Sequence, residues 1–398
     1  MDGRFVQIHT LTSYPAALLN RDDAGFAKRI PFGGASRIRI SSQCLKRHWR
    51  SFKGEGSLEE VGVPTSVRSR VTFDRYVVKP LLAEGLDAER VRLMTAAYMS
   101  ELLGESEKAK KAKDEAEELV LKTGQVTVLG SPEIEFVKSE VRQLCQADAT
   151  IKDAKAANKA VKDRLGKDGR KNLQALRHGA GLSAAMFGRM VTSDILARLD
   201  SAIHVAHAFT VHAEASESDY FSAVDDLLQV EGDLGSGHIN STELTSGLYY
   251  GYVVVDVPQL ISNLEGCSRE AVHEASPVLA ADVVQRMIRL IATVSPGAKL
   301  GSTAPFATAH MVLVETGRSQ PRTLANAFLK PVSPSPDLVA NTYAALARHI
   351  TELDGMYGIS TRRKLAGIGP IGPVVETVGT PAPLSEVGIW VGQEIRGA

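Results

Sequence analysis

The sequence has few cysteines, and they are not arranged to hold a metal or to form a disulfide framework. Cys44, Cys145 and Cys267 are far apart and odd in number, and no CxxC pair occurs. This usage is typical of a reducing compartment. No run of about 18 apolar residues is present, and the start MDGRFVQIHT lacks the apolar stretch of a signal peptide. We therefore expect a cytoplasmic protein without a membrane span.

The chain also lacks an excess of either charge and the common nucleotide and hydrolase motifs. Its 398 residues include 46 basic and 46 acidic side chains. Any contact with nucleic acid must therefore come from a local patch. The stretch SPGAKLGST places its lysine before the second glycine and so fails the P-loop pattern, while GxGxxG and GxSxG are absent. These absences disfavour the common enzyme classes.

Two sets of side chains leave metal chemistry open. His204, His207 and His212 fit neither one helix face nor strand alternation, so ordinary strand histidines are the simpler interpretation. Asp22 and Asp23 could belong to a magnesium-dependent nuclease, but they lie among arginines and lysines that they could orient. We expect neither a bound metal nor another cofactor.

The first part of the chain predicts two strands and a helix. Residues 4–14 and 36–40 have strand character; in the second, isoleucines and arginines alternate, which puts Arg37 and Arg39 on one face. Ser41 is a good helix N-cap, and an apolar stripe that includes Leu45 and Trp49 follows it. Residues 57–199 then read as a helical insertion, with a buried helix over 182–199.

The later part predicts a long β-excursion. Residues 199–268 contain no Lys or Arg, and eight acids lie between Val211 and Thr245. Strand-like ends flank a polar middle here, which indicates one strand out and another back. A helix at 278–294, a strand at 310–316 and a helix at 336–354 follow. The tail after 355 is rich in Gly and Pro and predicts mostly loop, with EVGIWVG as a last strand.

Positive charge gathers near the start of the chain. Eight Lys or Arg but only two acids lie between Asn20 and Arg50. The cations surround the predicted start of a helix, where backbone N–H groups attract anions. Such an arrangement favours a track for successive phosphates. The aromatic signature of a base-reading RRM is missing, which favours contact with the nucleic-acid backbone.

The same stretch carries a family signature. LNRDDAGFAKRIPFGGASRIRISSQCLKRHWR resembles the N-terminal signature of the backbone subunit of the type I-E CRISPR Cascade complex, the CasC family. SDYFSAVDDL, FGRM and TLANAF also look like family landmarks. His48, Trp49 and Cys44 are mild departures from the pattern.

The resemblance implies an α+β fold with a modified RRM (ferredoxin-like) palm, an inserted helical fingers domain and a β-hairpin-like thumb. The parts would be palm at 1–56, fingers at 57–199, a palm strand at 200–207, thumb at 208–246 and palm again at 247–398.

The implied function is a non-catalytic scaffold for antiviral defence. Copies would stack head to tail along one crRNA, kink it with their thumbs and present it for pairing with target DNA, beside other Cascade subunits. The acidic thumb suggests docking on a basic surface of the next copy. A nuclease of the same superfamily that uses Asp22 or Asp23, and a protein-only filament, stay open.

The resemblance also places the guide contacts. Transferred to matching positions, the backbone contacts are Arg21, Lys28, Arg37, Arg39, Ser41, Gln43, Lys46, Arg47, Arg50 and Lys299. Lys299 could equally be a solvated loop lysine. Tyr220 and Phe221 could wedge or stack against bases, or could pack in a small thumb core. Met190 and its neighbour Phe187 could touch bases, although filling of the core is the simpler interpretation.

Overall fold

The chain forms two compact units. The computed structural model describes residues 5–103, 120–147, 151–174, 179–189, 196, 199–224, 236–297 and 303–397. What we call the sheet unit comprises Met1–Leu58, His204–Val257 and Ala280–Ala398, and the helical unit comprises Glu59–Ile203 and Pro258–Leu279. The predicted insertion at 57–199 falls almost entirely in the helical unit. That unit also takes in 258–279, which we had assigned to the palm.

The sheet unit is built on one antiparallel sheet with the strand order β11-β10-β1-β9-β7-β3-β2, and β6 and β8 also pair with β9. Its strands are β1 (Phe5–Ala17), β2 (Arg29–Phe32), β3 (Ala35–Ile40), β6 (Ile203–Val205), β7 (Ala208–Thr210), β8 (Ser216–Val224), β9 (Ser236–Asp256), β10 (Ala309–Gly317) and β11 (Arg362–Gly367). Its helices are α1 (Ser42–Ser51), α10 (Val278–Thr293), η5 (Ala325–Phe328), α11 (Leu338–Tyr357), α12 (Gly372–Val378) and α13 (Leu384–Arg396).

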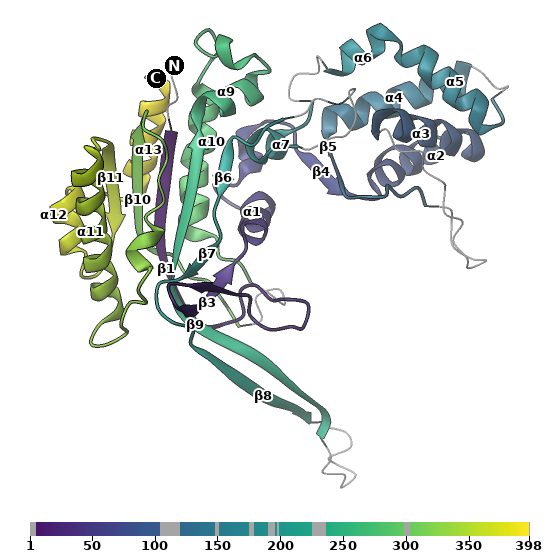
Figure 1. The fold of residues 1–398 in the computed structure, drawn as a ribbon. Helices are drawn as coiled ribbons and strands as arrows, with labels where there is room; N and C mark the ends of the chain where they lie inside the picture. The colour runs from purple at the N-terminus through teal and green to yellow at the C-terminus, as the bar shows by residue number, and fades with distance from the viewer. Residues whose placement is uncertain are drawn as a thin grey trace. The chain divides into compact units, whose positions relative to one another are not determined.

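Helices cover both faces of this sheet, as Figure 1 shows. On one face, α11, α12 and η5 pack on a cluster that includes Leu11, Tyr250 and Leu313. On the other face, α1 and α10 enclose a small cavity lined by residues such as Thr10 and Trp49. Because both faces are covered, residues 6–12 of β1 are all buried, polar ones included. The mixture of helix and antiparallel sheet confirms the predicted α+β class.

A buried charged network lies on the α11 face of the sheet. The Glu315 carboxylate accepts from Arg363 Nε at 2.6 Å and from Arg322 Nη2 at 3.2 Å, and its other oxygen lies 3.3 Å from His9 Nε2. Asp354 holds Arg363 from the other side at 2.8 Å. Burial alone would raise the pKa of Glu315. The His9 hydrogen bond and the charges of Arg363 and Arg322 outweigh burial and lower that pKa to about 2. Burial lowers the pKa of His9 itself, so His9 acts as a hydrogen-bond partner rather than as a cation.

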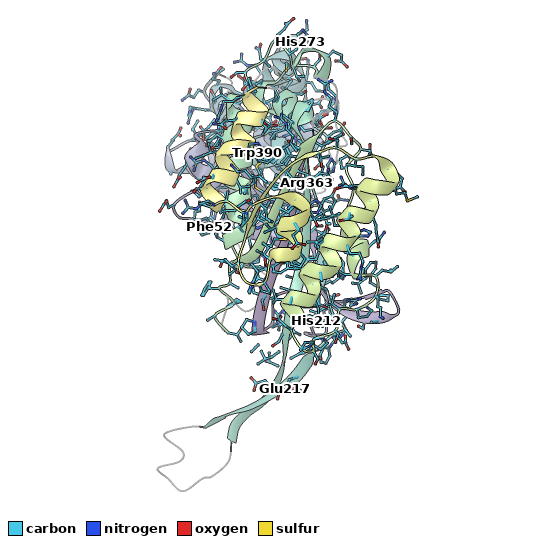
Figure 2. The ribbon with its side chains drawn as sticks, turned by 90° about the vertical axis from the view of Figure 1, so that its left-hand side faces the viewer. Phe52, His212, Glu217, His273, Arg363 and Trp390 are labelled. Carbon is cyan, nitrogen blue, oxygen red and sulfur yellow. The ribbon has the colours of Figure 1, made fainter. Side chains whose placement is uncertain are left out.

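The predicted β-excursion is present, but its paired strands form a hairpin within the polar middle that we expected to be an irregular loop. The strands β8 and β9 pair from Ser216 opposite Thr245 to Val224 opposite Ser236. Towards its other end, β9 runs on into the centre of the sheet beside β1. The hairpin therefore projects from the sheet, with Glu217 on its stem and His212 near its base (Figure 2). Residues 225–235, and the side chains of 220–240, lie outside the described part of the chain.

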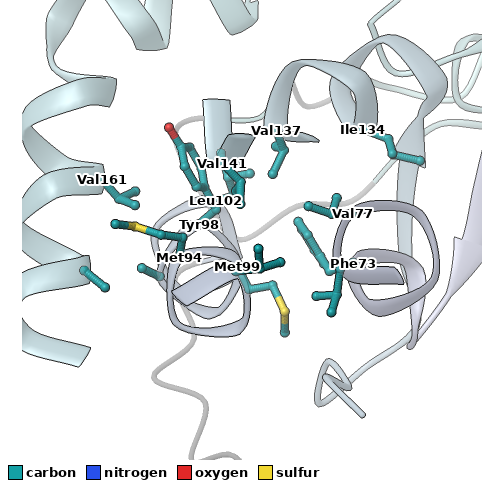
Figure 3. Packing of buried hydrophobic residues seen from close by; sticks show 14 of the residues in the cluster. Phe73, Val77, Met94, Tyr98, Met99, Leu102, Ile134, Val137, Val141 and Val161 are labelled. Atoms are coloured by element: carbon teal, nitrogen blue, oxygen red, sulfur yellow. The ribbon is translucent and has the colours of Figure 1, made fainter. Parts of the chain in front are cut away.

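The helical unit has its own core. Its elements are η1 (Leu58–Val61), β4 (Ser66–Ser69), the π-helical turn η2 (Asp74–Val78), α2 (Lys79–Ala83), α3 (Ala88–Leu103), β5 (Thr127–Gly130), α4 (Ser131–Ala147), α5 (Ala154–Leu165), α6 (Lys167–Gln174), α7 (Leu182–Phe187), α9 (Val257–Glu265) and η3 (Arg269–Ala271). Figure 3 shows the packing of Phe73, Met94, Tyr98 and Val141, all buried. A buried ion pair, Arg189 Nη1 to Glu133 Oε2 at 2.6 Å, adds a polar contact.

Two sequence predictions for secondary structure are wrong. The helix over 182–199 ends as α7 at Phe187, because Gly188 takes a positive φ of 80° that right-handed helices do not allow. The tail is not mostly loop, and EVGIWVG lies in helix α13 instead of a strand. Val387, Val391 and Ile395 are spaced four apart and fully buried, which is the stripe of a helix.

Candidate nucleic-acid interface

The basic stretch folds as predicted into a strand followed directly by a helix. The strand β3 pairs with β2 on one side and with β7 on the other, and Ile38 and Ile40 are buried in the sheet unit. Helix α1 begins at Ser42 and buries Leu45 and Trp49. Strand β3 thus fixes where the start of α1 lies.

The N-terminus of α1 is capped and carries open hydrogen-bond donors. The Ser41 hydroxyl caps it by accepting from Cys44 N–H at 3.2 Å, and Ser41 N–H donates to Asn20 Oδ1 at 2.9 Å. Within the described residues, the N–H groups of Ser42 and Gln43 have no hydrogen-bond partner, and the first turn holds no acid. Two open donors and the positive end of the helix dipole favour a negative ligand.

Cations lie near the first turn of α1 and near the neighbouring His207. Burial raises the pKa of the Cys44 thiol, in the first turn of α1, and the nearby charges of Arg47 and Lys28 act in the opposite direction. Partial burial and then the charges of Arg39 and Lys28 lower the pKa of His207. Lys28 therefore acts on both Cys44 and His207, whereas Arg47 acts on Cys44 and Arg39 on His207. Among the described residues, none of the three forms an ion pair with a carboxylate.

Arg39 is held in place by neutral partners. Its Nε donates to Arg29 O at 3.1 Å and its Nη1 to His207 Nδ1 at 3.1 Å. Because Nδ1 accepts, His207 is the neutral tautomer with its proton on Nε2. His207, which the sequence analysis considered only as a metal ligand or an ordinary strand histidine, thus adds a donor beside Arg39.

Arg37 is a correction to the sequence analysis. It does not share an exposed face with Arg39, because its side chain is 0% exposed. Its guanidinium donates to the backbone oxygens of Phe32 at 3.3 Å, Thr210 at 3.0 Å and Phe328 at 2.9 Å. The second face of β3 is covered, so this arginine ties three segments together and does not reach the surface.

Arg29 is used inside the chain as well. It forms ion pairs with Glu214 at 2.8 Å and with Glu243, which lies at the hairpin base. Glu243 also accepts from Ala27 N–H at 2.6 Å, and Glu214 accepts from the Ser36 hydroxyl at 2.7 Å. These contacts, which we call the hairpin clamp, fix the hairpin base against β2 and the loop before it.

The remaining predicted contacts are distributed as follows. Arg21, Gln43 and Arg47 are exposed, whereas Lys46 and Arg50 on α1 are half-buried. Ser41 is buried and serves as the cap. Tyr220 and Phe221 have their backbone in β8, opposite Ser241 and Asn240, but their side chains lie outside the described residues. Met190 and Lys299 also lie outside the described residues, and Phe187 ends α7.

The alternative metal sites find no support in the described geometry. His212 is engaged on both nitrogens, with Ala213 O at 2.6 Å and Leu248 N–H at 3.2 Å. The Asp22 carboxylate accepts from Phe26 N–H at 2.9 Å and so shapes its own loop. In the part of the chain that the structure describes, no three His, Cys, Asp or Glu side chains gather as metal ligands. Nor does that part contain a helix long and apolar enough for a membrane span.

Phe26 is a surface residue that the sequence analysis missed. It lies between Arg21 and Lys28, and 55% of it is exposed. The signal was the aromatic residue inside the basic run, which our search for an RRM signature passed over.

Fold and site together define an α+β protein with open N–H donors and nearby cations at the start of one helix. The chain belongs to the family described as CT1975-like protein, whose model matches residues 6–369. No curated protein sequence matches it.

Two solved structures share the fold. A chain of a CRISPR RNA-guided surveillance complex described as pre-nicking is 24% identical, with a TM-score of 0.78 over 98% of this chain and 99% of that one. A chain of another CRISPR RNA-guided surveillance complex is 20% identical, with a TM-score of 0.66 over 99% of this chain and 100% of that one. The resemblance to a surveillance-complex subunit is thus confirmed in family and fold. The I-E subtype stays a prediction.

Proposed function

We propose that this chain is a non-catalytic crRNA-binding backbone subunit of a type I-E CRISPR Cascade surveillance complex. The observation that carries the proposal is the open N-terminus of α1 with cations near it: Lys28 and Arg47 act on Cys44 in its first turn, and Lys28 and Arg39 act on His207. These cations and the two free N–H groups suit the phosphates of one RNA strand. The fold shared with chains of CRISPR RNA-guided surveillance complexes supports the same function.

The chemistry of this surface suits a guide of any sequence. Ammonium, guanidinium and backbone N–H donors contact phosphate oxygens, which are the same in every nucleotide. Each contact is weak and depends on salt, so affinity accumulates over several phosphates and several copies. Because these contacts go to the backbone, they do not occupy the pairing edges of the bases, which can pair with target DNA.

The other parts of the chain have matching roles in this proposal. The sheet unit acts as the palm, the helical unit as the fingers and the β8–β9 hairpin as the thumb that crosses and kinks the guide. Copies assemble head to tail along the RNA beside other Cascade subunits in the cytoplasm. Heterologous contacts of this kind do not close on themselves, so they build filaments.

Acidic residues on the hairpin stem can serve the contact between copies. Glu217 and Asp219 are exposed on β8, whereas Glu214 is occupied by the hairpin clamp. We expect Glu217→Lys with Asp219→Lys to reduce the sedimentation coefficient of RNA-loaded assemblies at physiological salt. Glu214 is unsuitable for this test because its replacement would also release the hairpin base. Assemblies of unchanged size in the double variant would argue against acidic docking.

The main experiment is co-expression of the chain with a CRISPR array. The purified protein is sized, its 260/280 absorbance ratio is recorded and bound RNA is sequenced. The test variant carries Lys28→Glu, Arg39→Glu and Arg47→Glu. The matched control carries Arg318→Glu, Arg348→Glu and Arg396→Glu, which change the same charge at exposed positions on other elements of the sheet unit.

The outcomes separate clearly. Protected RNA of guide length in the wild type and the control, but not in the test variant, supports the proposal. Equal RNA recovery from both variants would remove the α1 surface as the binding site. A wild type free of RNA even when co-expressed with its sister subunits would overturn the proposed function.

A further inference from the structure

The loop that precedes β2 holds one aromatic ring out in solvent. Phe26 is 55% exposed, although it is a large apolar side chain. Its backbone is fixed twice to Asp22, because Phe26 N–H donates to Asp22 Oδ1 at 2.9 Å and Phe26 O accepts from Asp22 N–H at 2.8 Å. Gly25 completes the turn with a positive φ of 94°. The ring is thus presented by a closed turn.

The same loop is anchored to the sheet unit just after Phe26. Ala27 is 2% exposed, forms a β-bridge with Arg21 and donates its N–H to Glu243 of the hairpin clamp at 2.6 Å. Lys28 N–H then donates to Asn20 O at 2.9 Å. An exposed apolar side chain on its own needs no explanation. Here, however, backbone contacts on both sides of Phe26 hold its position in the fold.

The charges around the ring indicate what it meets. Arg21 and Lys28 flank Phe26 in the loop, and Lys28 acts on His207 together with Arg39. An aromatic face among cations is the combination by which proteins bind single-stranded nucleic acid. The cations hold phosphates, while the ring stacks on a base of any identity.

We propose that Phe26 stacks on a nucleobase of the bound RNA and that Asp22 positions it for this contact. The inference rests on the proposed function and adds to it a contact with a base. It also gives the Asp22 carboxylate a role as a loop cap, in place of a metal ligand. Such a platform fixes the position of the guide on each copy without reading its sequence.

The test uses the full chain and a single-stranded RNA that carries 5-iodouridine, which crosslinks to a stacked aromatic ring under ultraviolet light. Affinity is measured by fluorescence polarisation for the wild type, Phe26→Ala, Phe26→Leu and Phe26→Trp. The matched control is Tyr357→Ala, because Tyr357 is an aromatic residue of the same unit that is 64% exposed at the end of α11. All variants are checked for unchanged melting temperature.

Stacking predicts a graded result. Phe26→Ala weakens RNA binding roughly 5- to 150-fold, the range measured when stacked aromatics are removed. Phe26→Leu should bind RNA more weakly than the wild type but more tightly than Phe26→Ala, because leucine is apolar but lacks a π-face. Phe26→Trp and Tyr357→Ala should bind RNA like the wild type. The crosslinked peptide of the wild type contains Phe26. Asp22→Ala, which frees the turn, should weaken RNA binding less than Phe26→Ala does. It should not alter any cleavage of the RNA relative to the wild type.

Three other outcomes would overturn the inference. Equal affinities for Phe26→Ala and Tyr357→Ala, with the wild type binding RNA, would remove the stacking role and leave the proposed function intact. Wild-type RNA affinity of Phe26→Leu, together with no crosslink to Phe26 in the wild type, would indicate apolar packing of this side chain, for example against a second copy of the chain. A wild type that binds no RNA would remove the proposed function and this inference together.

Discussion

Replacement of Arg37 by Met should damage the fold, whereas replacement of Arg39 by Met should damage only binding. The two arginines are two positions apart on β3 and the sequence gives no reason to treat them differently. In the structure, however, Arg37 is fully buried and bonded to three carbonyl groups, while Arg39 is partly exposed beside His207.

The magnitude follows from those contacts. Hydrogen bonds from a charged donor contribute about 1.5–3 kcal/mol each, and Arg37 makes three. Part of that sum offsets the cost of burying a charge without a carboxylate partner, and methionine recovers that cost. A net loss of about 3 kcal/mol remains, because three backbone oxygens are left unsatisfied. For a unit of about 200 residues this lowers the melting temperature by roughly 6–12 °C.

The assay pairs thermal melting, followed by circular dichroism, with RNA binding by fluorescence polarisation. We expect Arg37→Met to have a lower melting temperature than the wild type. At low temperature, the folded fraction of this variant should bind RNA with the wild-type affinity. The free energy of unfolding of Arg39→Met should stay within about 1 kcal/mol of the wild-type value, and this variant should bind RNA more weakly. Arg37→Met with unchanged melting but weakened binding would refute the assignment of Arg37 to the interior.

Three further predictions concern stability. The pKa of Glu315 is about 2 in the folded chain against 4.5 ordinarily, so its ionised form stabilises the fold above pH 4.5. We expect the free energy of unfolding to fall by up to about 3 kcal/mol between pH 5 and pH 2 because of this group. Denaturant titrations of Glu315→Gln over the same pH range should lack that part of the decrease. Gly33→Ala should cost about 2 kcal/mol or more in urea unfolding, because φ is +61° and the new Cβ would lie 1.4 Å from Leu329 O. Ser41→Ala should cost about 1 kcal/mol through the lost cap of α1, as differential scanning calorimetry would measure; an unchanged melting curve would contradict the capping role.

The strand, cap and helix from β3 to α1 could be predicted from the sequence because local rules agree there. Ile38 and Ile40 alternate as a strand requires, Ser41 is a strong N-cap, and Leu45 and Trp49 keep helical spacing. The existence of an out-and-back excursion was also visible from the strand-like segments at its ends, although β8 and the first part of β9 formed in the polar middle between them. Where local signals reinforce one another, the sequence suffices.

The errors arose where distant contacts decide. Nothing near Arg37 shows that Phe328, almost 300 residues away, covers it. In EVGIWVG the short apolar run fits either period, and only the whole of α13 reveals the four-residue spacing. Gly188 ends α7 through a backbone angle that an isolated glycine does not announce. Phe26 was missed because its exposure depends on Asp22 and on the anchor at Glu243.

Strand β9 serves two structures at once, and that limits how its length can vary. Its 21 residues span about 70 Å as one strand, with the hairpin stem at one end and the centre of the sheet at the other. Side chains alternate along it, so the loss of a single residue near Ser246 would turn either the stem or the sheet segment over. Insertions and deletions at this junction should therefore be tolerated only when two residues, or another even number, are added or removed. Relatives with longer or shorter hairpins should differ there by even numbers of residues.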